Sequence, residues 1–162
     1  AEYTLSTCQL DFCLPAKFDL KYIDRDGVEK TPVVLHRAIL GSLDRFMAYL
    51  IEETKGIFPV WLAPVQVKVL PVSDKSMDYA GKVYEALRRQ RFRVELDDRN
   101  EKIGYKIRYA RQEDKVPYMI IIGEKEIAEG NISVRDRETD QTTVYSLEDF
   151  AAKLEKEIRE RA

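Results

Sequence analysis

The stretch from His36 to Phe46 contains residue types whose order could hold a phosphate group. Gly41 ends the apolar run before it, and Ser42 can cap a helix that starts immediately afterwards. Asp44 in the first turn suits the positive end of that helix, whereas Arg45 opposes the helix dipole. An anion at this end, such as a triphosphate, would accept hydrogen bonds from backbone N–H groups and from the guanidinium. The alternative is that Arg45 points into solvent.

A second segment, residues 99–111, gathers positive charge in a chain whose net charge is −2. It holds five basic residues against one acidic residue, Glu101, a net charge of about +4. The basic residues are Arg99, Lys102, Lys106, Arg108 and Arg111. The segment follows a predicted strand, and open α/β sheets bind ligands at the carboxyl ends of their strands. The pattern favours a local RNA-binding face, with a solvated helix flank as the alternative.

The composition excludes some classes of protein. A net charge of −2 is incompatible with a uniformly basic coat for nucleic acid, so any RNA contact must be local. No apolar run reaches the length of a membrane span, and the first residues lack a basic segment followed by an apolar one. We therefore expect a cytoplasmic protein without a membrane partner. Cys8 and Cys13 lie in a predicted extended run, point to opposite faces and are expected to be reduced thiols; their spacing is wider than that of most zinc sites.

The elements that position these residues fall into two parts. In the first, the predicted strands are residues 4–14, 18–23 and 33–40, with a turn at Asp24–Gly27. A helix follows and ends near Gly56. Its apolar residues have the spacing of one buried face and are Leu43, Phe46, Met47, Leu50 and Ile51. This is an antiparallel strand-strand-strand-helix piece, incomplete, as if cut from a larger sheet.

In the second part, strands alternate with helices. After a proline-rich linker at residues 58–64, the pattern predicts strands at 65–72, 91–96, 118–123, 132–135 and 142–145. Helices are predicted at 75–89, at about 101–114 and from Ser146 onward. Such alternation indicates an α/β fold with a mixed, mainly parallel sheet and flanking helices. The predicted domains are residues 1–63 and 64–162.

The whole chain resembles one family. The run PVVLHRAILGSLDRFMAYLIEE, with TLSTCQLDFCLPAKFDLKYID before it and FPVWLAPVQVKVLPVS after it, closely resembles the C-terminal part of threonyl-tRNA synthetases, which are class II enzymes. The resemblance implies that this segment is motif 3 of a catalytic domain and that Arg45 is catalytic and binds ATP. It places Gly41, Ser42, Thr7 and Gln9 at the ATP or adenylate site. The alternative for Thr7 and Gln9 is ordinary sheet polarity.

The same resemblance gives His36 a role. In this family the matching histidine is one of three protein ligands of a zinc ion that selects threonine through its hydroxyl group. The other two ligands, together with motifs 1 and 2, lie upstream in the family and are missing from this sequence. The implied cofactors are therefore ATP with Mg²⁺ and Zn²⁺ in the parent enzyme, with an incomplete zinc site here. This chain alone is not expected to activate threonine.

The run DDRNEKIGYKIR resembles the anticodon-binding domain of class IIa synthetases. The match implies that the anticodon loop is contacted by Asn100, Lys102, Arg108, Glu126 and Arg135. Amide, carboxylate and guanidinium groups of this kind read unpaired bases in RNA loops.

Our leading hypothesis is the C-terminal portion of a threonine–tRNA ligase, with threonine tRNA, ATP and threonine as partners and a homodimer in the full enzyme. The alternative is a non-catalytic tRNA-binding module or regulatory paralogue, which would tolerate Arg45→Ala and His36→Ala. A flavodoxin-like binder of small molecules is a weaker interpretation, because no glycine-rich loop follows the strand at 65–72.

Overall fold

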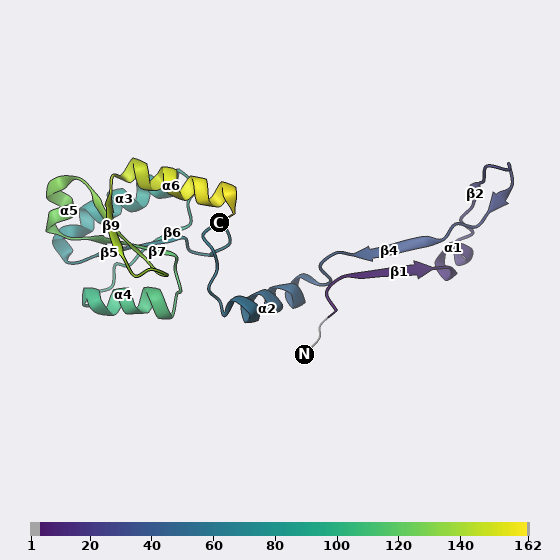
Figure 1. Cartoon of the computed structure of the whole chain (residues 1–162), viewed down its shortest axis with the longest axis horizontal. Helices are drawn as coiled ribbons and strands as arrows, with labels where there is room; N and C mark the ends of the chain where they lie inside the picture. Colours follow the sequence, from purple (N-terminus) through teal and green to yellow (C-terminus); the bar gives the residue numbers. More distant parts are fainter. Residues whose placement is uncertain (1–3, 162) are drawn as a thin grey trace. The chain divides into compact units, whose positions relative to one another are not determined.

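The computed structural model describes residues 4–161, which form two compact units that divide between Lys55 and Gly56. In the first unit, β1 (Thr7–Asp11) pairs antiparallel with β4 (Val34–Ala38), and β2 (Tyr22–Ile23) pairs with β3 (Glu29–Lys30) (Figure 1). A short helix, α1 (Cys13–Lys17), follows β1, and α2 (Leu43–Thr54) follows β4. The predicted antiparallel piece is therefore present, with additional short elements.

The predicted first strand was too long. β1 stops at Asp11 because the Asp11 carboxylate accepts hydrogen bonds from the N–H groups of Cys13 and Leu14, at 2.8 and 2.9 Å, which turns the chain into α1. Cys13 thus begins a helix, and the prediction that both cysteines lie in one extended run was wrong. Both thiols are unpaired and exposed. The predicted turn is confirmed: Gly27 has a φ of +79°, and its N–H donates to Asp24 O at 2.9 Å.

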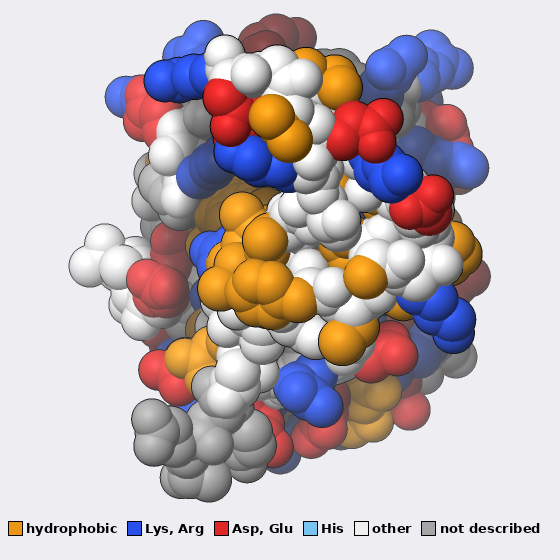
Figure 2. All heavy atoms as spheres, turned by 90° about the vertical axis from the view of Figure 1, so that its right-hand side faces the viewer, with side chains coloured by type: hydrophobic (Ala, Val, Ile, Leu, Met, Phe, Trp, Pro, Cys, Tyr) orange, Lys and Arg blue, Asp and Glu red, His pale blue; other side chains and the backbone are white. Residues whose placement is uncertain are grey.

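The apolar stripe of α2 has the predicted spacing, but none of the residues of α2 is buried. Leu43 is 70% exposed, and Leu35 on β4 is 62% exposed. Figure 2 shows apolar side chains on the surface between charged ones. A two-stranded ribbon with so little burial is marginal by itself. The exposure is what a piece cut from a larger sheet is expected to show.

The second unit contains a five-stranded sheet in the order β6-β5-β7-β8-β9. The strand β5 (Val67–Pro71) lies between β6 (Val94–Leu96) and β7 (Tyr118–Ile122) and is parallel to both. The remaining strands, β8 (Ile132–Asp136) and β9 (Thr142–Tyr145), are added antiparallel. The predicted α/β fold with a mixed sheet is confirmed.

Helices cover both sides of this sheet. The helices α3 (Met77–Arg89), which follows the 3-10 turn η1 (Asp74–Ser76), and α6 (Leu147–Glu160) lie on one side, and α4 (Ile103–Gln112) lies on the other (Figure 1). Ser146 caps α6 as predicted, since its hydroxyl accepts a hydrogen bond from Asp149 N. A further helix, α5 (Glu124–Glu129), was not predicted, because six residues are too few for a clear periodicity. None of the helices in residues 4–161 has the length and hydropathy that a membrane crossing requires.

The core of the second unit has two layers, one on each side of the sheet. Val67, Val69 and Ile120 pack with Phe150 and Leu154 of α6. On the other side, Leu70 and Met119 pack with Ala110 of α4. Alternate residues of each strand serve alternate layers, as the two-residue period of a strand requires.

The proline-rich linker belongs structurally to the second unit. Val60 and Ala63 are buried. The Arg93 guanidinium donates hydrogen bonds to Ala63 O at 2.8 Å and Trp61 O at 2.9 Å. The predicted domain boundary at residues 63 and 64 therefore lies inside the second compact unit, and the linker is packed rather than a loose tether, as its composition predicted.

Candidate nucleic-acid interface and the nucleotide-site residues

The residues predicted for the adenylate site share one face of the β1–β4 ribbon. Gln9 is the direct register partner of His36, so their side chains point to the same face. Thr7 lies two residues from Gln9 in the same strand and is therefore on that face as well, as the two-residue period predicts. On the opposite face, Leu10 and its partner Leu35 are apolar, whereas Arg37 is charged. The polar side chains of Thr7, Gln9 and His36 are thus on one face, where they could meet a ligand together.

His36 is held by a carboxylate. Its Nε2 lies 2.9 Å from Asp11 Oδ2. Hydrogen bonds from Leu14 N–H and from His36 lower the pKa of Asp11 below its ordinary value. A carboxylate that accepts Nε2–H fixes the tautomer with a free electron pair on Nδ1, which is the arrangement that metal-binding histidines use. Among residues 4–161 no three potential ligands gather, so these residues do not form a zinc site without ligands from elsewhere.

The fold requires a glycine at position 41 for a reason that the sequence did not reveal. Its φ is +68°, and a Cβ built there would lie 2.8 Å from Leu5 O. Glycine is therefore required by the backbone of residue 5, whatever approaches it from outside. The Ser42 hydroxyl accepts a hydrogen bond from Arg45 N at 3.4 Å, so the predicted cap is present. The Arg45 side chain is exposed and lines a hollow with Tyr49 and Glu52.

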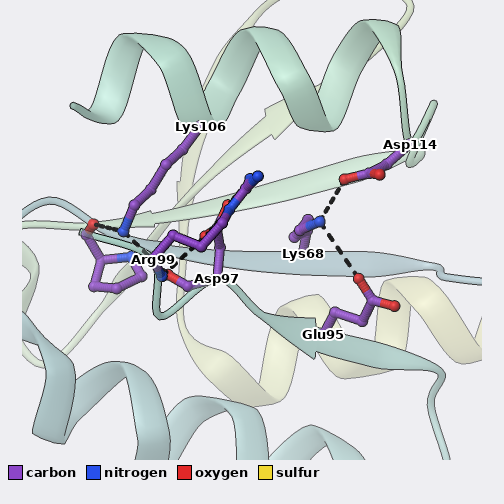
Figure 3. Close-up of polar contacts among 7 residues, drawn as sticks. Lys68, Glu95, Asp97, Arg99, Lys106 and Asp114 are labelled. Carbon is purple, nitrogen blue, oxygen red and sulfur yellow. Dashed lines mark hydrogen bonds and ion pairs between the residues drawn. The ribbon is translucent and has the colours of Figure 1, made fainter. Parts of the chain in front are cut away.

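In the second unit the predicted basic face is not continuous. Lys106 is only 3% exposed, and its Nζ donates to Asp97 O at 3.0 Å and to Pro71 O at 3.3 Å (Figure 3). Arg99 forms an ion pair with Asp97, and Arg111 forms one with Asp140. The prediction of five basic residues on one face was therefore wrong. Of the five basic residues, one is buried and two are in ion pairs, so Lys102 and Arg108 are the two that remain exposed. The periodicity of the sequence could not distinguish these two from the others.

The loop that carries Asn100 and Lys102 is anchored to the sheet by hydrogen bonds. It follows β6, and Asp97 N donates to Val69 O at 2.9 Å. The buried Asp97 carboxylate accepts two hydrogen bonds from Arg99, at 2.9 and 2.6 Å. These bonds lower the pKa of Asp97 below its ordinary value. Asn100 and Lys102 are exposed on this anchored loop, where an RNA can reach them.

Lys68 was not singled out from the sequence. It is a cation in the apolar strand β5, and its Nζ contacts the carboxylates of Asp114 and Glu95 (Figure 3). Burial works to lower the pKa of Lys68, but the neighbouring carboxylates outweigh it and raise that pKa. Its position within the apolar run VQVKVLP could have identified it as a paired residue, since a charge in a buried strand must find a partner.

Glu126 and Arg135 lie on a different part of the same unit. Ser133 Oγ donates to Glu126 Oε1 at 2.7 Å, and Gly123 N donates to Glu126 Oε2 at 2.8 Å, so Glu126 caps α5. Ser133 and Arg135 share one face of β8, and Arg135 is the register partner of Met119, which packs toward α4. Arg135 pairs with Asp140 at 2.8 Å. Glu126 and Arg135 therefore face the side of the sheet that carries α4.

Glu126 permits a test that separates its capping role from any contact with RNA. We expect Glu126→Ala to lower the free energy of unfolding by about 1–2 kcal/mol, because two partly buried donors, Gly123 N and Ser133 Oγ, lose their acceptor. Glu126→Gln should stay within about 0.5 kcal/mol of the wild type, since glutamine also serves in capping boxes. The measurement is urea unfolding followed by fluorescence of Trp61, the single tryptophan.

The contribution of Glu126 to the free energy of unfolding changes with pH in a direction that follows from its pKa. Partial burial disfavours the Glu126 anion, but the bonds from Ser133 and Gly123 prevail and lower its pKa. A lowered carboxyl pKa stabilises the fold above the ordinary value, and this stabilisation is lost as the pH falls through the folded-state pKa. The difference in the free energy of unfolding between the wild type and Glu126→Ala should therefore become smaller near pH 3. A difference that becomes larger as the pH falls would contradict the capping role.

Comparisons with known proteins bear on this arrangement. The anticodon binding domain family matches residues 66–157. Threonine–tRNA ligases of Geobacillus sp. and of Caldanaerobacter subterraneus subsp. tengcongensis are 56% and 54% identical to the chain, over 96% of this chain and 24% of each relative. The crystal structure of the RNA binding domain of threonyl-tRNA synthetase from Cryptosporidium parvum Iowa II is similar with a TM-score of 0.82 and 37% identity, over 95% of this chain and 39% of that one.

The chain thus spans about a quarter of the length of the curated relatives it matches. The resemblance to the C-terminal part of threonyl-tRNA synthetases, indicated by the sequence, is confirmed by these matches. The matched segment, residues 66–157, makes up more than half of the 162 residues and contains the whole sheet of the second unit. The chain therefore belongs to the anticodon binding domain family.

Proposed function

We propose that the second unit binds the anticodon loop of a threonine tRNA and that the chain is the C-terminal portion of a cytoplasmic threonine–tRNA ligase. The observation that carries this proposal is the anticodon binding domain match over residues 66–157. The geometry supports it, because Asn100, Lys102 and Arg108 are exposed and Glu126 and Arg135 are only partly buried. An unpaired base can therefore approach each of these side chains.

Different side chains serve different parts of the recognition. Asn100 offers an amide that can both donate to and accept from a base edge, whereas Lys102 and Arg108 offer positive charge to phosphates. Contacts to phosphates strengthen binding to any RNA and weaken with salt, while contacts to base edges distinguish one anticodon from another. The chain as a whole is acidic, so we expect affinity to depend on these local cations.

We further propose that the first unit supplies motif 3 contacts to ATP, with Mg²⁺ as its counter-ion, when the rest of the ligase is present. Thr7, Gln9 and Arg45 would bind the nucleotide, and Gly41 and Ser42 would shape the turn before α2. His36 would be one of three zinc ligands, the other two coming from outside this chain. Threonine is the amino-acid substrate in this proposal, and the full enzyme is a homodimer.

The RNA-binding part is tested by equilibrium binding of the full chain to a threonine tRNA transcript. We expect Asn100→Ala to weaken binding about tenfold and to reduce the preference for the threonine anticodon. Arg108→Ala should weaken binding to all transcripts to a similar degree and lower the dependence on salt by about one phosphate contact.

Arg89→Ala is the matched control for Arg108→Ala, because Arg89 is an exposed arginine on α3, on the opposite side of the sheet. It should leave affinity unchanged. Equal losses for the two arginine variants would show that binding follows overall charge and would contradict the proposed interface.

A further inference from the structure

The outward side of α4 carries a hollow of about 240 Å³ that no predicted role explains. It is lined by Tyr105, Arg108, Tyr109, Gln112 and Glu113. Arg108 alone among these residues was predicted to contact RNA. The volume is below that of pockets for drug-sized ligands, which begin at roughly 300 Å³, and suits a single heterocycle.

Two cations hold one wall of the hollow in place. The guanidinium of Arg99 lies 4.4 Å from the centre of the Tyr109 ring, and Lys68 Nζ lies 5.7 Å from it. Both cations are themselves fixed, Arg99 by Asp97 and Lys68 by Asp114 (Figure 3). Cation–π contacts of this kind restrain the ring. Tyr109 is therefore an ordered support rather than a mobile side chain.

The second ring is exposed and rests against the first. The Tyr105 ring lies 6.0 Å from the Tyr109 ring, tilted by 35°, and Tyr105 is 42% exposed. A restrained aromatic surface can stack on a flat ligand without losing much side-chain entropy. Stacking on an aromatic side chain is the common way in which proteins hold unpaired bases of RNA.

The rim of the hollow can contact the edge of a base. Gln112 has an amide that donates and accepts, Glu113 has a carboxylate that accepts, and Arg108 has a guanidinium that donates. All three are exposed. The hollow lies on the helix that begins directly after the loop with Asn100 and Lys102. An RNA loop that contacts those residues would pass close to it.

We propose that this hollow takes one unpaired base of the bound tRNA, outside the three anticodon positions, stacked on Tyr105. The proposal rests on the proposed function and adds a contact point to it. Stacking recognises any base, so this contact adds affinity rather than anticodon preference. Gln112 and Glu113 orient the base by hydrogen bonds to its edge.

The test combines protein variants with abasic RNA. The threonine tRNA transcript is prepared with one loop nucleotide at a time made abasic, outside the anticodon triplet, and its affinity for the full chain is measured. We expect one abasic position to weaken binding by roughly fivefold to tenfold. Tyr105→Leu should weaken binding of the intact transcript by the same factor, and the abasic change should then have no further effect. Tyr105→Phe, which keeps the ring, should bind like the wild type.

Other outcomes overturn the proposal. If the Tyr105→Leu and abasic effects multiply at every position, or if neither changes affinity, no base occupies the hollow. If Tyr105→Leu disturbs the fold, Gln112→Ala provides a second test, because Gln112 is exposed on the same helix. This variant should lower affinity only for transcripts that retain the base that occupies the hollow. Preference between anticodons should survive in both variants; its absence in the wild type would instead refute the proposed function.

Discussion

Replacing Lys106 with methionine is expected to lower the free energy of unfolding of the second unit by about 2–3 kcal/mol, whereas Lys102→Met should change it by less than about 0.5 kcal/mol. The two lysines are four residues apart in the same basic segment, yet Lys106 is buried and Lys102 is exposed. Loss of the Lys106 ammonium leaves Pro71 O and Asp97 O, at the ends of β5 and β6, without their donor. Buried carbonyls without partners account for the expected cost.

The measurement is urea unfolding monitored by Trp61, which lies in the linker packed against the second unit. RNA binding gives the complementary result: Lys102→Met should weaken binding of a threonine tRNA transcript and lower its salt dependence, with stability unchanged. If both substitutions destabilised the fold equally, the assignment of Lys106 as the residue that ties the loop to the sheet would be wrong.

In a complete ligase, Arg45→Ala is expected to reduce aminoacylation by about 100- to 1000-fold. The proposal places this guanidinium beside the phosphates of ATP, where charge develops during formation of the adenylate. A suitable enzyme is the Geobacillus sp. threonine–tRNA ligase in which this chain replaces the matching 24% of the sequence. The measured quantity is the rate of ATP–pyrophosphate exchange together with the rate of tRNA charging.

The matched control is Arg37→Ala, an exposed arginine on β4 whose register partner is Cys8 on the face opposite to Gln9 and His36. It should leave the exchange rate within about threefold of the parent. Affinity for tRNA should be the same in both variants. If this chain serves only to bind tRNA, Arg45→Ala should instead leave the charging rate of the ligase unchanged.

Much of the second unit could be predicted because its strands and helices have strong periodic patterns. The strands around Val67 and Ile120 are buried on both faces and contain apolar runs that are unmistakable in the sequence. Ser42 and Ser146 were recognised as caps because capping depends on local sequence alone. The sequence also placed Gln9 and Thr7 on one face, since a strand alternates its side chains.

The failures share a different physical cause. Asp11 ends β1 by accepting hydrogen bonds from the following N–H groups, and this competes with strand formation in a way that hydropathy does not reveal. Burial of Lys106 depends on carbonyl groups 9 and 35 residues away in the chain. The reason for Gly41 is Leu5 O, which only the folded backbone brings near. Long-range contacts of this kind decide which charged residues remain available to a ligand.

Recognition of the anticodon by the second unit requires that two transcripts differing only in their anticodon bind with different affinity. Binding of the wild-type chain to threonine tRNA and to the same tRNA with a changed anticodon is measured at low and at moderate salt. We expect the transcript with the threonine anticodon to bind about tenfold more tightly at both salt concentrations, although both affinities fall as salt rises. Equal affinity for the two transcripts at both salt concentrations would contradict it.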